Sequence, residues 1–320
     1  MDRNLQINYP YMHGCTLADP FVDDGTFVQE MIFSYRCSAE CERCHMLVRN
    51  KNAMKPETAI RIADDSVAYA VSSGFKRIIF SLIGGEAFEA LDRLEEFYHM
   101  LIERKYRIPI LFRIVTCGKS VSDEAYKWLD EHPEISLALR WDSSTKETVW
   151  NHSPESFRRA VDVIYLTITQ SEIYQIKDNL LACAKLNIPI VPDYSMLNRL
   201  NKADLEQYLI QMYICAGLSK PLYRHLFLTN FHTCGDRNSR GIRCANFNGK
   251  MYQCRFLAPG YQLSRIYSTD PSDIMPKECE NCSAKSSCLL CPAAAASVNN
   301  LYCEMLRTVL ISTKKCLPND

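Results

Sequence analysis

The chain has 320 residues, which is enough for one large domain and a smaller one with a sizeable buried core. Its 37 Lys and Arg residues balance 37 Asp and Glu residues, so the net charge favours neither nucleic acid nor an anionic membrane as a partner. The N-terminal residues lack the apolar core of a signal peptide, and no apolar run approaches the length of a membrane span. The outlier is a count of 16 cysteines. In a cytoplasmic chain, cysteines at this density indicate metal binding rather than disulfides. We therefore expect a cytoplasmic, oxygen-sensitive protein.

Residues 1–26 hold scattered turn formers, and we expect them to form a short extension. From residue 27, apolar runs alternate with amphipathic segments. The expected strands are 28–34, 77–82, 109–115, 135–140, 161–167 and 188–194, and the expected helices are 57–72, 89–105, 122–131, 154–160, 173–186 and 202–215. Six β/α units in succession predict an α/β fold with a parallel sheet. In barrels of this kind the chemistry lies on the loops that follow the strands' carboxyl ends.

Three cysteines follow the first expected strand at CxxxCxxC spacing. They are Cys37, Cys41 and Cys44, and a short loop would bring their thiolates to one point. Iron–sulfur clusters are normally held by four cysteine thiolates, so three thiolates would leave one iron open to another ligand. The alternative is a structural zinc site, which prefers paired CxxC elements and four protein ligands.

CxxxCxxC after a first strand resembles the radical S-adenosylmethionine (radical SAM) enzymes. The resemblance implies that Cys37, Cys41 and Cys44 hold a [4Fe-4S] cluster whose unique iron binds the amino and carboxylate groups of SAM. It also implies a reductant such as flavodoxin or ferredoxin, and cleavage of SAM to a 5'-deoxyadenosyl radical that abstracts hydrogen from the substrate. The fold implied is a partial (β/α)6 barrel, which we place at residues 27–228.

The second expected strand runs into Gly84-Gly85-Glu86. Paired glycines let the backbone approach a ligand closely, and a carboxylate can receive an ammonium group through a charge-assisted hydrogen bond. By itself Gly-Gly-Glu is most often a turn. In this position it is similar to the GGEP motif of the family, which implies that Gly84, Gly85 and Glu86 bind the methionyl group of SAM. Ala87 stands where the family usually has proline.

Cys117 ends the third expected strand, within Thr116-Cys117-Gly118. Many members of the resembling family have Thr-Asn-Gly here. One interpretation is a small apolar filler, which is how most free cysteines behave. The other is a catalytic role, in which Cys117 donates a hydrogen atom to a substrate radical, as an epimerase requires. Asp142, after the fourth strand, stays unassigned because aspartate there is a common capping or turn residue.

The segment 229–320 is rich in cysteine and shows little periodicity, so metal would be needed to hold it together. Its cysteine order resembles the SPASM domain, which binds two auxiliary [4Fe-4S] clusters. The resemblance assigns the first auxiliary cluster to Cys234, Cys244, Cys254 and Cys291, and the second to Cys279, Cys282, Cys288 and Cys303.

Two points of this ligand assignment stay open. Cys244 is the least secure ligand, and without it the first auxiliary cluster would have an iron open to a substrate thiolate. Cys288 and Cys291 stand closer together than the family pattern has them, which leaves their partition between the two clusters open. Two zinc sites are the alternative, because CxxC…CxxC spacing suits zinc equally well.

SPASM enzymes mostly act on peptides or proteins, so the resemblance implies a ribosomally made peptide as substrate. The outcome would be epimerisation, a thioether or carbon–carbon crosslink, or oxidation. Arg255 argues against sulfatase maturation, because the resembling subgroup has an acidic residue there. Because few residues precede the first strand, we expect no winged-helix leader-binding domain, and we expect the barrel mouth or a separate leader-binding protein to hold the peptide. We expect neither nucleic acid nor a membrane as a partner.

Two other classes stay open. One is a radical SAM dehydrogenase of a protein side chain or of a small alcohol or sugar. The other is a non-catalytic iron–sulfur electron carrier or zinc-stabilised binding protein, which would neither bind nor cleave SAM. The Gly84-Gly85-Glu86 element argues against this last class.

Overall fold

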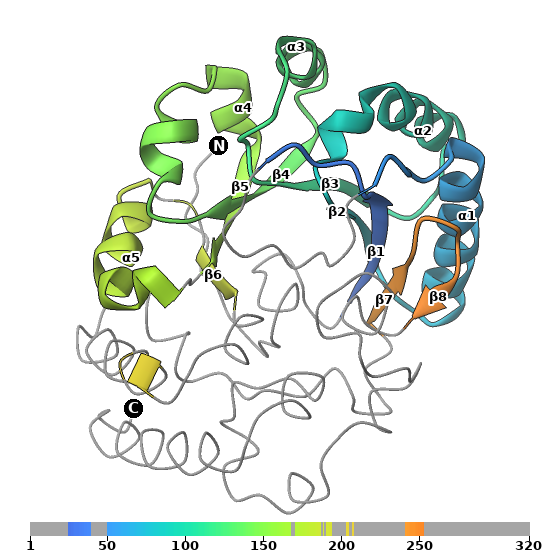
Figure 1. Cartoon of the computed structure of the whole chain (residues 1–320). Coiled ribbons are helices and arrows are strands. Elements are labelled where there is room, and N and C mark those ends of the chain that lie inside the picture. The colour runs from blue at the N-terminus through green and yellow to red at the C-terminus, as the bar shows by residue number, and fades with distance from the viewer. Residues whose placement is uncertain are drawn as a thin grey trace, which may run out of the picture.

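The computed structural model describes residues 25–39, 50–167, 170–186, 188, 190–193, 203–204, 207 and 241–252. Within them, one curved sheet has the strand order β6-β5-β4-β3-β2-β1-β7-β8, and the helices cover its convex side (Figure 1). The strands are β1 Thr26–Ser34, β2 Arg77–Gly84, β3 Ile110–Thr116, β4 Ser136–Trp141, β5 Val161–Thr167, β6 Ile190–Asp193, β7 Ile242–Ala245 and β8 Met251–Tyr252. The α-helices are α1 Pro56–Ser72, α2 Leu91–Glu103, α3 Asp123–Glu131, α4 Glu155–Ala160 and α5 Ile176–Ala184. Shorter helical turns are η2 Ala87–Ala90, η3 Lys146–Trp150 and η4 Gln170–Gln175.

Strands β1 to β6 pair in parallel and in chain order, which confirms the six expected β/α units and the α/β class. The edges of the sheet are β6 and β8, and the strands that the structure describes do not close into a ring. The partial (β/α)6 barrel is therefore confirmed for this part of the chain. Of the expected helix at 202–215, only residues 203, 204 and 207 are described, and they are helical.

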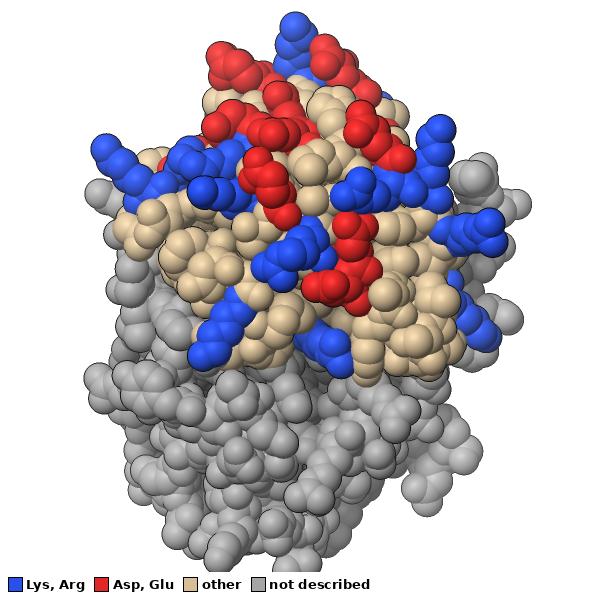
Figure 2. Space-filling model, turned by 90° about the vertical axis from the view of Figure 1, so that its right-hand side faces the viewer, with Lys and Arg blue, Asp and Glu red and all other residues tan. Residues whose placement is uncertain are grey.

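The hydrophobic core lies between the sheet and its helices, because alternate strand residues point to opposite faces. Phe33 of β1 stacks near Phe97 of α2 at a ring-centroid distance of 6.2 Å, and Phe97 lies 5.7 Å from Phe112 of β3. On the outside, acidic and basic side chains both occur on the face shown in Figure 2, with the acidic ones gathered toward its upper middle and the basic ones mainly at its sides and lower part. This mixture agrees with the balanced net charge.

The other face of the sheet carries a buried polar row. Glu30, Ser81, Arg113 and Ser136 occupy matching register positions on β1 to β4, and all are enclosed. Arg113 donates from Nε to Ser136 Oγ at 3.0 Å and from Nη2 to Asp162 Oδ2 at 2.9 Å. A buried guanidinium requires such partners, since an unpaired buried charge is costly.

The hairpin of β7 and β8 joins the barrel sheet, although the sequence analysis placed residues 241–252 in the cysteine-rich segment. Strand β7 pairs in parallel with β1, from Val28 opposite Ile242 to Met31 opposite Ala245. The hairpin also packs on neighbouring elements, because the Arg243 guanidinium lies 3.6 Å from the centre of the Tyr69 ring on α1. A division of the chain at residue 228 stays a prediction.

The predicted N-terminal extension and most of the segment 229–320 lie outside the described residues. In the part of the chain that is described, no helix combines the length and the apolar character that crossing a membrane requires.

Candidate active site at the carboxyl ends of the strands

The loop that carries Cys37 is closed at its base by main-chain hydrogen bonds. Tyr35 N donates to Asn52 O at 2.9 Å, and Asn50 N donates to Tyr35 O at 3.2 Å. The chain therefore leaves the end of β1 and returns beside it, as a short ligand-bearing loop must. Cys37 lies on this loop and is partly exposed.

The paired glycines at the end of β2 contact the start of this loop. Gly85 N donates to Ser34 O at 2.7 Å, and the next amide, of Glu86, donates to Arg36 O at 2.8 Å. A Cβ on Gly84 would lie 2.3 Å from Ser34 O, and a Cβ on Gly85 would lie 2.1 Å from Arg36 O. Glycine is thus required here for the close approach of two backbones, a reason that the sequence analysis did not foresee.

Glu86 is fully buried and is held by the end of β3. Its Oε2 accepts a hydrogen bond from Thr116 Oγ1 at 2.8 Å and one from Cys117 N at 3.3 Å, and its Oε1 accepts from Phe88 N at 3.5 Å. Burial raises the pKa of Glu86 to about 7, and these hydrogen bonds offset part of the rise. These hydrogen bonds fix the position of the carboxyl group.

Cys117 lies beside this carboxyl group. Its Sγ is 3.6 Å from Glu86 Oε2, and the side chain is partly exposed. By contrast, Cys183 on α5 is enclosed in the hydrophobic core, as its position on an apolar helix face predicts. The location of Cys117 at the site is what a role in catalysis requires.

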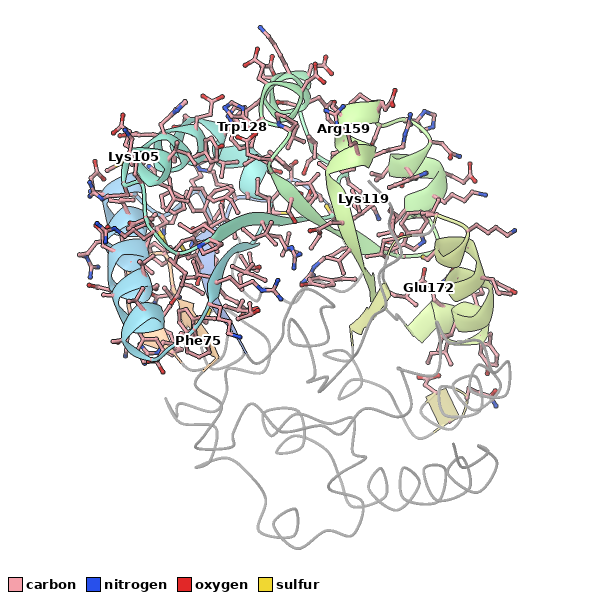
Figure 3. All side chains as sticks on the ribbon, turned by 180° about the vertical axis from the view of Figure 1, so that it is seen from behind. Phe75, Lys105, Lys119, Trp128, Arg159 and Glu172 are labelled. Carbon is pink, nitrogen blue, oxygen red and sulfur yellow. The ribbon has the colours of Figure 1, made fainter. Side chains whose placement is uncertain are left out.

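A second polar group lies after β3, β4 and β5. Lys119 Nζ, after β3, is 2.9 Å from Asp142 Oδ2, after β4. Glu172, after β5, accepts a hydrogen bond from Ser143 N. Lys119 and Glu172 are labelled in Figure 3. Burial alone would raise the pKa of Asp142, but hydrogen bonds from Ser144 and Lys119 and the charge of Lys119 lower it overall. Asp142 Oδ1 also accepts from Ser144 N at 2.9 Å, so Asp142 serves as a turn residue. Lys119 and Glu172 were missed because no motif marks them.

The residues described hold no group of three or more His, Cys, Asp and Glu side chains able to bind a metal ion. Of the predicted iron ligands, the structure describes only Cys37 and Cys244. The others lie outside the described residues, namely Cys41, Cys44, Cys234, Cys254, Cys279, Cys282, Cys288, Cys291 and Cys303. Arg255 lies outside them as well.

Cys37 and Cys244 differ in their exposure. A thiolate that binds a four-iron cluster must open onto the space that the cluster fills. Cys37, a soft donor on a loop beside Gly85, is partly exposed and fits a cluster. Cys244 is enclosed within β7, opposite Glu30 of β1 and Tyr252 of β8. The role of Cys244 as a ligand stays a prediction.

Comparison with solved structures identifies the fold. No protein-family model matches the sequence, and no curated protein matches it. A solved structure of histidine-tagged anSMEcpe with bound AdoMet matches with a TM-score of 0.62 and 14% identity, over 91% of this chain and 97% of that one. The chain has the radical SAM fold. The resemblance inferred from Cys37, Cys41, Cys44 and the glycine pair is thereby confirmed for the fold.

Two further structures of radical SAM fold include a peptide. They are native anSMEcpe with bound AdoMet and the Cp18Cys peptide, and the same protein with AdoMet and the Kp18Cys peptide. Each matches with a TM-score of 0.61 and 14% identity, over 91% of this chain and 99% of that chain.

The structure brings together three features that the sequence pointed to separately. Cys37, the Gly84-Gly85-Glu86 element and Cys117 meet at the carboxyl ends of β1, β2 and β3. Three loops that are far apart in sequence thus form one site, at the end of the sheet where barrels of this kind place their chemistry.

Proposed function

We propose that the protein is a radical SAM enzyme that modifies a ribosomally made peptide, by abstracting hydrogen from one of its residues. The observation that carries the proposal is the meeting of Cys37, Gly85 and Glu86 at the carboxyl ends of β1 and β2, in a radical SAM fold. Cys37 would hold a [4Fe-4S] cluster together with Cys41 and Cys44. SAM bound there supplies the 5'-deoxyadenosyl radical.

The described residues would bind and orient SAM. Glu86 offers a buried carboxylate whose Oε2 is fixed by Thr116 and by the Cys117 amide, so a cation can bind without reorganisation of the site. An ammonium group would be held there by a charge-assisted hydrogen bond, which is strong away from bulk water. Gly84 and Gly85 would set the distance between this carboxylate and the loop of Cys37.

A peptide substrate is supported by the similar structures that contain peptides together with AdoMet. Because the identity is 14%, these structures support the class of substrate and not its sequence. A separate leader-binding protein and a reductant such as flavodoxin or ferredoxin would complete a cytoplasmic system. Segment 229–320 would hold two auxiliary clusters, and Cys244, which is enclosed, is the least secure of their candidate ligands.

The role of Cys117 distinguishes epimerisation from a crosslink or an oxidation. In an epimerisation, its thiol would give a hydrogen atom to the substrate carbon radical, so that an S–H bond breaks as a C–H bond forms on the opposite face. One electron and one proton from the reductant system would then restore the thiol. In a crosslink or an oxidation, electrons would instead leave through the auxiliary clusters, and Cys117 would not be consumed.

The test is cleavage of SAM by anaerobically reconstituted protein with dithionite as reductant. We expect 5'-deoxyadenosine and methionine from the wild-type protein, and neither from a variant with Cys37, Cys41 and Cys44 changed to Ala. Equal cleavage by both proteins, or none by wild type with a full complement of iron, would contradict the proposal.

A further inference from the structure

The helical turn η2 carries two glutamates, one just before it and one within it, that contact different parts of the site. Glu86 caps the turn and contacts the end of β3, whereas Glu89 contacts the loop that carries Cys37. Residues three apart in a 3-10 helix lie one turn apart on the same side. A single turn therefore links the proposed SAM-binding carboxylate to the proposed cluster loop.

Glu89 binds the residue that directly follows Cys37. Its Oε1 accepts two hydrogen bonds from Ser38, one from the main-chain N at 2.6 Å and one from Oγ at 2.7 Å. Short hydrogen bonds to an ionised acceptor are about twice as strong as neutral ones. Glu89 is half-buried while Ser38 is exposed, so the contact holds an otherwise exposed turn in place.

Arg36, which directly precedes Cys37, is held by the same region. It donates from Nη1 to the main-chain oxygen of Glu89 at 3.3 Å and from Nε to Lys51 O at 3.0 Å. The Arg36 guanidinium also lies 4.0 Å from Asp92 Oδ1, so part of its charge is compensated by an acid other than Glu89. Both neighbours of Cys37 in the chain are thus tied to η2 and the start of α2.

The Glu89 carboxylate also has an electrostatic consequence for a cluster on Cys37. The reduction potential of an iron–sulfur cluster depends on nearby charge and on hydrogen bonds to its sulfurs. Glu89 places a negative charge one residue from Cys37, and it engages an amide that could otherwise donate to sulfur. Both effects make it harder to add an electron to the cluster, and a cluster that is harder to reduce is a stronger reductant once it is reduced.

We propose that Glu89 is a positioning residue, which fixes the conformation of Cys37 and holds the reduction potential of its cluster low. The inference rests on the proposed function and assigns a tuning role within that site.

The experiment is a potentiometric titration of the reduced-cluster EPR signal that disappears in Cys37→Ala. Three variants are compared with wild type. Glu89→Gln keeps a hydrogen-bond acceptor but removes the charge, Glu89→Ala removes both, and Glu96→Gln is the matched control, because Glu96 is an exposed glutamate on α2. Iron release to a chelator is followed in parallel, so that loss of the contact and loss of the charge are measured separately.

We expect Glu89→Gln to retain its iron and to shift the midpoint potential to a more positive value. Glu89→Ala should show the positive shift and also release iron several-fold faster, while Glu96→Gln should match wild type. A midpoint in Glu89→Gln equal to that in Glu96→Gln would overturn the inference and leave the proposed function intact. A wild-type protein without any signal that depends on Cys37 would overturn both.

Discussion

The loop after β1 and the strand β7 beside it each carry a predicted iron ligand, and the two cysteines have opposite surroundings. Cys37 is partly exposed on a loop that Gly85 and Glu89 hold in place. Cys244 lies on β7, the strand next to the edge strand β8, opposite Glu30 of β1, and it is enclosed. The spacing of cysteines therefore suggests a set of ligands, but the local backbone decides which thiols can reach a metal.

The largest expected effect separates these two cysteines. Cys37→Ala should abolish cleavage of SAM, because it removes one of three thiolates at the proposed cluster. Cys244→Ala should leave the iron content unchanged and lower the free energy of unfolding by roughly 1–2 kcal/mol, as loss of a buried side chain does. Deoxyadenosine formation, iron analysis and denaturant titration measure the two outcomes. Loss of four irons in Cys244→Ala would show that Cys244 is an iron ligand despite its enclosure.

Cys117 sharpens the comparison, because it is partly exposed like Cys37 but lies beside a carboxyl group. If it is the hydrogen-atom donor, Cys117→Ala should form deoxyadenosine at the wild-type level and yield no epimerised peptide. The two products can be quantified in one reaction by mass spectrometry. A normal yield of modified peptide would show that Cys117 only fills space at the end of β3.

The variant Gly85→Ala tests whether the conformation of the Cys37 loop depends on the close approach of the backbone at the end of β2. Gly85→Ala would place a Cβ 2.1 Å from Arg36 O and 3.2 Å from the Cys37 Cβ, so it should cost roughly 1–3 kcal/mol and weaken iron retention. The matched control is Gly74→Ala, where φ is +80° but no atom lies within 4 Å of the added Cβ. Gly74→Ala should lower stability by about 1 kcal/mol and leave iron retention unchanged. Equal iron loss in both variants would remove the steric argument.

Glu86→Gln should weaken SAM binding by about 10- to 100-fold, the range expected when a hydrogen bond to a charged group is lost. Glutamine nearly preserves the shape of the side chain, so the hydrogen bonds from Thr116 and Cys117 have an acceptor of the same geometry. Isothermal titration under anaerobic conditions measures the dissociation constant. Wild-type affinity in this variant would exclude Glu86 from SAM binding.

The raised pKa of Glu86 predicts that SAM affinity depends on pH, a smaller effect than that of the Glu86→Gln substitution. Because burial raises this pKa to about 7, the carboxyl group is ionised above that pH and protonated below it. The ionised form binds an ammonium group, so SAM affinity should be highest above pH 7 and should fall about tenfold per unit as pH drops below it. Asp142 has a lowered pKa and stays ionised in this window. SAM affinity should not depend on pH in Glu86→Gln. A pH dependence that persists in this variant would show that another group is responsible for it.

Most of the fold was predictable, because six apolar strand patterns and their helices extend over many residues. The bounds shift by a few residues, as where the helix expected at 173–186 is α5 from Ile176 after the turn η4. Strand β7 was not predictable, since it has only four residues and is defined by its pairing with β1 and β8.

The candidate site was predictable where a local motif carries it. Cys37 and Gly84-Gly85-Glu86 lie in short patterns that can be read without a partner. Glu89 could not be found in this way, because its contact with Ser38 joins residues 51 positions apart in the chain. Lys119 and Glu172 were hidden for the same reason, since their partners follow a different strand.

The most direct test of the central claim is iron and sulfide analysis with Mössbauer spectra of anaerobically reconstituted protein. It is run beside the variant in which Cys37, Cys41 and Cys44 are changed to Ala. We predict about twelve irons in the wild-type protein and about eight in the variant, as three four-iron clusters require. Bound zinc, or an iron content that the substitutions leave unchanged, would contradict a radical cluster at Cys37.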